Sequence, residues 1–195
     1  MKLWLLPAAF VAAPFALAQS AFAQNTTGTV NLTGSVAPRC GVAASGNGSI
    51  FGQTVALGEL AASDGTLRAG IESQFANAVA AVSVACNTVA PTISVSATAL
   101  SAQTSTGTPP AGYANSIAYT ATVSLGTTGA VPVVLSAESG TSASHALSSG
   151  EGRIANSAGN LVLTATAFRT ATPTQILVAD SSYRGSIAIT IAPGA

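Results

Sequence analysis

The chain has 195 residues, of which 48% are hydrophobic and only 6% carry a charge. Six basic residues balance six acidic ones, so the formal net charge at pH 7 is zero. A chain with so few basic residues has no electrostatic footprint for nucleic acid or for an anionic membrane surface. Composition therefore argues against both classes of partner.

The first 23 residues have the layout of a secretory signal peptide. Lys2 supplies the positive charge, an uncharged apolar stretch covers residues 3–18, and residues 21–23 (AFA) form a small-x-small cleavage site. A transmembrane anchor is the alternative, but Pro7 and Pro14 interrupt a run that is already short for a span of about 20 residues. We expect export, removal of residues 1–23 and no membrane span in the mature protein.

Two cysteines, Cys40 and Cys86, remain in the exported chain. In an oxidising compartment the default for two cysteines is one disulfide, which would stabilise the fold by roughly 4 kcal/mol in the chain-entropy model. A metal pair is the alternative, but it lacks companion ligands because His145 is the only histidine. We therefore expect a Cys40–Cys86 disulfide and no metal site.

Short segments that alternate between apolar and polar residues follow one another along the mature chain, which is the pattern of β-strands. They cover residues 28–36, 78–86, 93–97, 117–125, 131–135, 161–168, 175–178 and 186–191. Two Ser/Thr/Gly-rich loops are expected at residues 101–114 and 136–159, and residues 66–77 leave room for a short helical turn. This pattern predicts a single all-β domain of the β-sandwich class.

The first and the last of these strands have the clearest faces. On the first, Gly28, Val30, Leu32, Gly34 and Val36 share one side, and Pro38 ends it. On the last, the apolar side carries three isoleucines: Ile187, Ile189 and Ile191. Alternation requires that one face is buried, but it does not say whether the first strand pairs within its own domain or elsewhere.

Side chains that would carry chemistry are scattered. His145 is expected on a solvent-exposed polar loop without a second His or Cys beside it, so neither a catalytic base nor a metal ligand is indicated. No Gly-x-Ser-x-Gly elbow, carboxylate pair or phosphate-binding glycine loop is present. We expect that the protein is not an enzyme and that it has no catalytic residue and no cofactor.

Three features occur in a fixed order: residues 28–36 (GTVNLTGSV) running into Cys40, residues 53–60 (QTVALGEL), and a strand ending at residues 82–86 (VSVAC). Over roughly residues 25–90 this order resembles the N-terminal half of chaperone–usher fimbrial subunits, the family of the type 1 pilins. Residues 82–86 and the ending at residues 183–191 also resemble the spore coat protein U group.

This resemblance implies an immunoglobulin-like β-sandwich that lacks its last strand and has an open groove. A periplasmic chaperone would fill the groove first, and the N-terminal extension of a neighbouring pilus subunit would replace it at an outer-membrane usher. Residues 24–37 would be the donor strand and residues 38–195 the pilin-like domain. Gly28, Val30, Leu32, Gly34 and Val36 would face the groove, which Ile187, Ile189 and Ile191 would border.

Two alternatives stay open. In a self-complemented surface or envelope protein the first strand would remain with its own domain. In an adhesin-type ligand-binding module, loops at residues 101–115 or 136–159 would contact a sugar, although Tyr113 is their only aromatic residue. One departure from the pilin pattern is the C-terminus, which lacks the tyrosine that type 1 pilins usually carry there.

Overall fold

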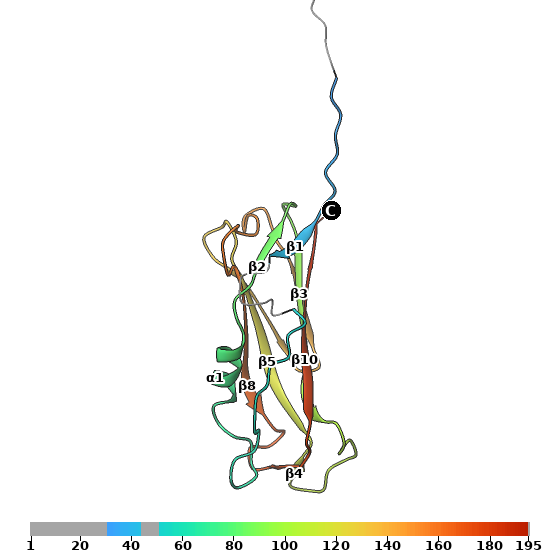
Figure 1. The fold of residues 1–195 in the computed structure, drawn as a ribbon, viewed down its shortest axis with the longest axis vertical. Helices are drawn as coiled ribbons and strands as arrows, with labels where there is room; N and C mark the ends of the chain where they lie inside the picture. Colours follow the sequence, from blue (N-terminus) through green and yellow to red (C-terminus); the bar gives the residue numbers. More distant parts are fainter. Residues whose placement is uncertain (1–30, 44–50, 195) are drawn as a thin grey trace, which may run out of the picture. The chain divides into compact units, whose positions relative to one another are not determined.

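The computed structural model describes residues 31–43 and 51–194. The chain divides into two units, residues 1–35 and residues 36–195. In its described residues the second unit consists mainly of β-strands, with an antiparallel main sheet and one short helix (Figure 1). The predicted all-β class is confirmed.

The elements follow one another with loops of very different length. They are β1 (Cys40–Ala43), α1 (Ile71–Ala78), β2 (Ser83–Cys86), β3 (Thr92–Ala102), β4 (Tyr113–Ala114), β5 (Ser116–Leu125), β6 (Val133–Glu138), β7 (Ser142–Ala146), β8 (Leu161–Arg169), β9 (Ile176–Leu177) and β10 (Tyr183–Ala192).

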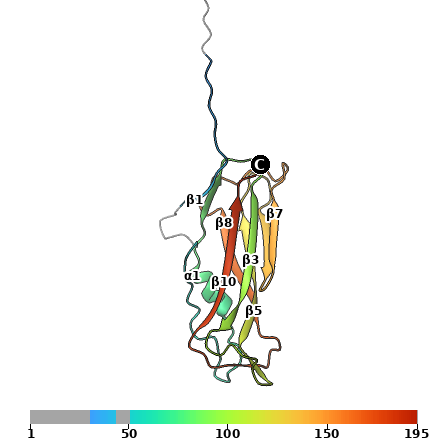
Figure 2. The ribbon, with the colours of Figure 1, turned by 90° about the vertical axis from the view of Figure 1, so that its right-hand side faces the viewer.

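Two long strands, β3 and β5, organise the main sheet. β3 has β10 and β7 as antiparallel neighbours, and these three strands lie side by side in Figure 2. β5 has β6 and β8 as antiparallel neighbours. The two groups are joined where β3 and β5 pair with each other, which happens only at Leu100↔Ile117 and Ser101↔Ser116.

The core lies on one face of each long strand, because alternate residues of a strand point to opposite sides. On β3 the alternate residues Ile93, Val95 and Ala97 are buried, with 0%, 0% and 3% of their surface exposed. On β5 every second side chain from Ile117 to Leu125 is buried. These strands were predicted from the same alternation, and the structure places them where the pattern indicated.

Two segments differ clearly from the sequence-based expectation. The expected loop at residues 136–159 contains β7, where serine and alanine pair with β3 although neither residue favours strands. His145 therefore lies on a strand, opposite Ile93, and not in a loop. Residues 31–36, the described part of the first expected strand, are not in a strand.

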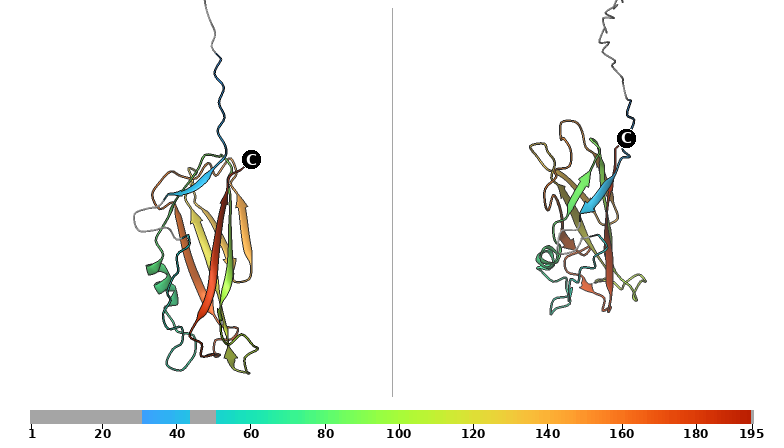
Figure 3. Two further views of the ribbon diagram at one scale, coloured as in Figure 1. Left: turned by 45° about the vertical axis from the view of Figure 1, so that its right-hand side comes forward. Right: turned by 45° about the horizontal axis from the view of Figure 1, so that its top comes forward.

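The helix α1 lies against β8 (Figure 3), on the edge that does not pair with β5. Its apolar side buries Ile71 and Phe75. At the edge, the Glu72 carboxylate accepts a hydrogen bond of 2.6 Å from the backbone N–H of Ala167. Exposed strand edges promote association between chains, so α1 acts as a cover for β8.

Candidate functional site

The candidate site lies along β10, the last strand of the sheet. One edge of β10 pairs with β3 from Tyr183↔Ala102 to Ala192↔Thr92. In the part of the chain that the structure describes, no strand pairs with its other edge. A strand edge of this kind presents backbone N–H and C=O groups to any extended peptide that approaches it.

A groove runs beside this edge, and we call it the β10 groove. Its upper part, which includes Ser186 and Ile187 of β10, has a volume of about 560 Å³. Its lower part, which includes Ala179 and Asp180, has a volume of about 840 Å³. Residues 53–61 line one side along both parts, and residues 177–187 line the other. Residues 53–59 form no strand, although apolar and polar residues alternate in their sequence. The groove separates them from β10, and no described strand lies between the two segments.

Incomplete burial of apolar side chains is concentrated at this groove. The core of the second unit has a fringe of apolar residues that are only partly buried. Most of that fringe lines the upper part of the groove: Val55, Leu57, Val79, Leu100, Leu163, Phe168 and Ile187. Apolar surface left half-exposed on one side is what a missing strand would leave behind, because each such side chain still gains free energy on full burial.

Tyr119 lines the upper part of the groove and links β5 to β10. It projects from β5, stacks on Phe168 with 5.3 Å between ring centroids, and donates a hydrogen bond of 3.0 Å to the backbone carbonyl of Ser186 on β10. Burial raises the pKa of the Tyr119 hydroxyl to about 12, so it remains a donor at physiological pH. The bond fixes β10 near its bulge between Arg184 and Ser186.

The Asp180 carboxylate holds the lower rim of the groove in place. It accepts hydrogen bonds from the backbone N–H groups of Ser182 (2.9 Å), Ser105 (2.8 Å) and Thr104 (2.8 Å). Those bonds, the one from Ser182 first, keep the pKa of Asp180 below its ordinary value. The loop after β3 and the start of β10 are thereby fixed to each other.

The expected donor strand lies partly outside the described residues, since Gly28 and Val30 are not described. Of the remaining three, Leu32 is 93% exposed, Val36 is 85% exposed, and Gly34 has no atom within 4 Å of the position a Cβ would take. Whether they are donated to another chain remains a prediction.

The three isoleucines of the last strand share one face of β10 and are each partly buried. Ile187 lines the upper part of the groove. Ile189 and Ile191 pack against the core further along β10, opposite Val95 and Ile93 of β3.

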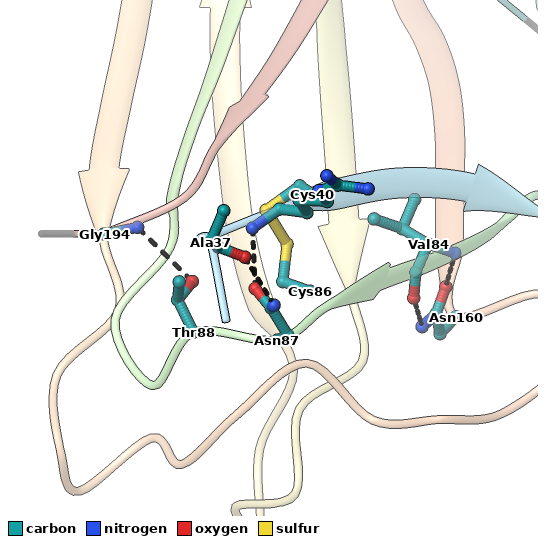
Figure 4. Close-up of a disulfide and its surroundings, with 9 residues drawn as sticks. Ala37, Cys40, Val84, Cys86, Asn87, Thr88, Asn160 and Gly194 are labelled. Atoms are coloured by element: carbon teal, nitrogen blue, oxygen red, sulfur yellow. Dashed lines mark hydrogen bonds between the residues drawn. A yellow bond between two sulfur atoms is a disulfide. The ribbon is translucent and has the colours of Figure 1, made fainter. Parts of the chain in front are cut away.

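The predicted disulfide between Cys40 and Cys86 is present. It joins β1 to β2 at directly opposite positions, and Asn87 follows immediately after it (Figure 4). The Asn87 side chain accepts a hydrogen bond of 2.6 Å from the N–H of Arg39 and donates one of 2.9 Å to the carbonyl of Ala37. Sequence reasoning missed Asn87, and its position beside Cys86 was the only available signal.

The sole histidine has a single acidic partner. His145 Nε2 lies 2.8 Å from a carboxylate oxygen of Glu151, whose second oxygen accepts bonds from Ser148. Hydrogen bonds from Ser148 and then the contact with His145 hold the pKa of Glu151 below its ordinary value. Among the described residues, no three His, Cys, Asp or Glu side chains come close enough together to hold a metal ion.

No described helix combines the length and apolar character needed to cross a membrane. Comparisons with family models, with curated proteins and with solved structures found no match to this chain.

Proposed function

We propose that the protein is a structural subunit of a surface pilus or fimbria that polymerises by donor-strand exchange. In this proposal the second unit is an immunoglobulin-like β-sandwich lacking one strand. The missing strand would lie beside β10, in the β10 groove. The N-terminal extension of a neighbouring subunit, residues 24–37, would supply it.

The observation that carries this proposal is the edge of β10 that no described strand pairs with, whose first residues border the more apolar, upper part of the groove. An added strand would bond to the backbone of β10 on one side and to residues 53–59 on the other. Its alternate side chains would cover the half-buried fringe at Leu163, Phe168 and Ile187. Backbone hydrogen bonds would provide affinity, and the spacing of the side chains would set the register.

The N-terminal extension has the properties such a strand needs. It contains 14 residues, whereas β10 has 10 residues, so it can pair along the whole open edge. Leu32 and Val36 are exposed in the free chain and lie on the same face of the alternation. Full burial of a large apolar side chain contributes roughly 1.5–3 kcal/mol.

The proposal includes export through the periplasm and a location on the outer surface. Before assembly, a periplasmic chaperone would occupy the open edge of β10, because an unpaired edge beside apolar surface promotes aggregation. An outer-membrane usher would then exchange the chaperone for the next subunit. The low charge of the chain agrees with a surface that is largely covered by neighbours, since low charge otherwise lowers solubility. No catalytic role or cofactor is part of the proposal.

The experiment is a gel of surface material sheared from the native host, detected with a tag on this protein and run with and without boiling in SDS. Wild-type protein is expected to give a ladder of multiples that collapses to monomer only on boiling. Leu32→Arg is expected to be secreted but to give no ladder, because the groove cannot bury an unpaired charge. Thr33→Arg, on the opposite face of the same segment, is the matched control and should keep the ladder.

Two results would contradict the proposal. Leu32→Arg protein that forms a ladder like the wild type would show that residue 32 is not buried in a neighbour. Wild-type protein that is folded, oxidised and monomeric in both lanes would favour the self-complemented alternative, in which the first strand stays with its own domain.

A further inference from the structure

Asn87 connects the start of the second unit to β2 in an unusual way. Its side-chain amide bonds to the carbonyl of Ala37 and to the N–H of Arg39, the two backbone groups on either side of Pro38. Its own backbone N–H donates a third hydrogen bond, of 3.0 Å, to the carbonyl of Arg39. Figure 4 shows this amide beside the Cys40–Cys86 disulfide.

Proline explains why a side chain is needed here. Pro38 has no N–H and cannot pair in a ladder like the residues of β1, which starts at Cys40. The Asn87 amide can both donate and accept hydrogen bonds, so it substitutes for a neighbouring strand on both sides of the proline. Asn87 is solvent-exposed, so its amide could bond to water instead, and burial alone does not explain these bonds.

Covalent geometry stiffens the same segment. The ring of Pro38 fixes its own φ, and it restricts the backbone of Ala37 to extended conformations. The disulfide then fixes Cys40 to Cys86, one residue before Asn87. Residues 37–40 are therefore held by three hydrogen bonds and one covalent bond within four residues.

We infer that Asn87 is a positioning residue: its amide holds the backbone on both sides of Pro38 to β2, at the point where the N-terminal extension joins the second unit. The extension can then pivot only before Ala37. The consequence for a filament rests on the proposed function. There, Asn87 would limit the bending between successive subunits without contributing to the affinity of the donated strand.

The test uses trypsin on the oxidised protein after removal of residues 1–23. The mature chain contains no lysine, so trypsin cuts only after its arginines, and a cut after Arg39 releases the extension while Cys40 stays bonded to the domain. Each side-chain hydrogen bond of this kind shifts a local opening equilibrium by roughly fivefold. We expect Asn87→Ala to raise the rate of this cut by roughly twentyfold.

Two further variants sharpen the test. Asn87→Asp keeps the acceptor for Arg39 but loses the donor to Ala37, so it should fall between wild type and Asn87→Ala. Asn156→Ala, at an exposed asparagine in the loop before β8, is the matched control and should cut at the wild-type rate. Filaments of Asn87→Ala, imaged by electron microscopy, should keep the boiling-sensitive ladder but show a shorter persistence length.

The outcomes separate this inference from the proposed function. If trypsin cuts the wild type and both Asn87 variants at the same rate, Asn87 does not hold residues 37–39 in place. This conclusion would hold whether or not filaments form. Faster cutting with an unchanged persistence length would overturn its effect on filament bending. If the wild-type chain makes no filament but the Asn87 variants are cut faster, the proposed polymerisation is wrong. The role of Asn87 in holding the start of the second unit would still be supported.

Discussion

The neighbouring strands β3 and β10 have similar sequences but different surroundings. Both alternate branched apolar residues with small polar ones, and they pair along almost their whole length. On β3 the inward residues Ile93 and Val95 are completely buried. On β10 their direct partners Ile191 and Ile189 are only partly buried.

The difference arises from the number of neighbours. β3 lies between β10 and β7, so strands cover both of its edges. β10 pairs with β3 on one edge, no described strand pairs with its other edge, and the groove borders only its first residues, up to Ile187. Alternation in a sequence therefore reports which face of a strand is apolar, and it does not report whether the fold completes the burial of that face. Experiments that change the burial of one strand but not of the other test this interpretation.

The largest expected effect comes from the matched pair Ile93 and Ile191, which lie opposite each other. Ile93→Ala should lower the free energy of unfolding of the oxidised monomer by about 4 kcal/mol, because the site is completely buried. Ile191→Ala should lower it by roughly half as much, because part of its surface remains in water. Denaturant unfolding of both variants measures the difference. Equal losses would mean that β10 is as well covered as β3.

A smaller effect is expected where Tyr119 reaches across to β10. Tyr119→Phe removes the hydrogen bond to the Ser186 carbonyl and should cost about 1–2 kcal/mol of stability at neutral pH. The pKa of this hydroxyl is raised in the folded state, so its contribution is fully present below the unfolded value of about 10 and is lost as pH rises towards about 12.

The alkaline measurement distinguishes this hydroxyl from the rest of the core. Unfolding midpoints of the wild type should decline between pH 9 and pH 11.5 more steeply than those of Tyr119→Phe. Parallel declines in the two proteins would show that Tyr119 does not titrate in this way.

The smallest effect is expected at the covered edge of β8. Glu72→Ala removes the acceptor for the N–H of Ala167 and should cost about 1 kcal/mol, while Asn77→Ala on the same helix should change little. Because α1 then holds the edge less firmly, association of Glu72→Ala monomers should rise with protein concentration, as light scattering would detect. Scattering that stays at the wild-type level would indicate that packing of Ile71 and Phe75 alone keeps the edge covered.

Parts of the fold that depend on strong alternation could be predicted from the sequence. The expected segments 93–97, 117–125 and 186–191 lie within β3, β5 and β10, because branched apolar residues at every second position define one buried face. The disulfide could be predicted as well, since two cysteines allow only a single pairing.

Other parts required the structure. β7 (SASHA) has no branched or aromatic residue, and its partner β3 supplies the reason for its strand conformation. Residues 53–59 alternate like a strand but form no strand among the described residues. The groove residues Tyr119 and Phe168 meet only through the pairing of β5 with β8, and no local pattern in the sequence indicates that contact.

The Cys40–Cys86 disulfide has a mechanical consequence for a filament built as proposed. Tension on the N-terminal extension would enter at Cys40, and the disulfide would transmit it directly to Cys86, close to the start of β3. Residues 41–85, which include one side of the β10 groove and the helix α1, would lie outside the path of the force. A subunit could then be stretched by one neighbour without loosening its hold on the strand of the other, and reduction of this bond should lower the force at which single filaments lengthen.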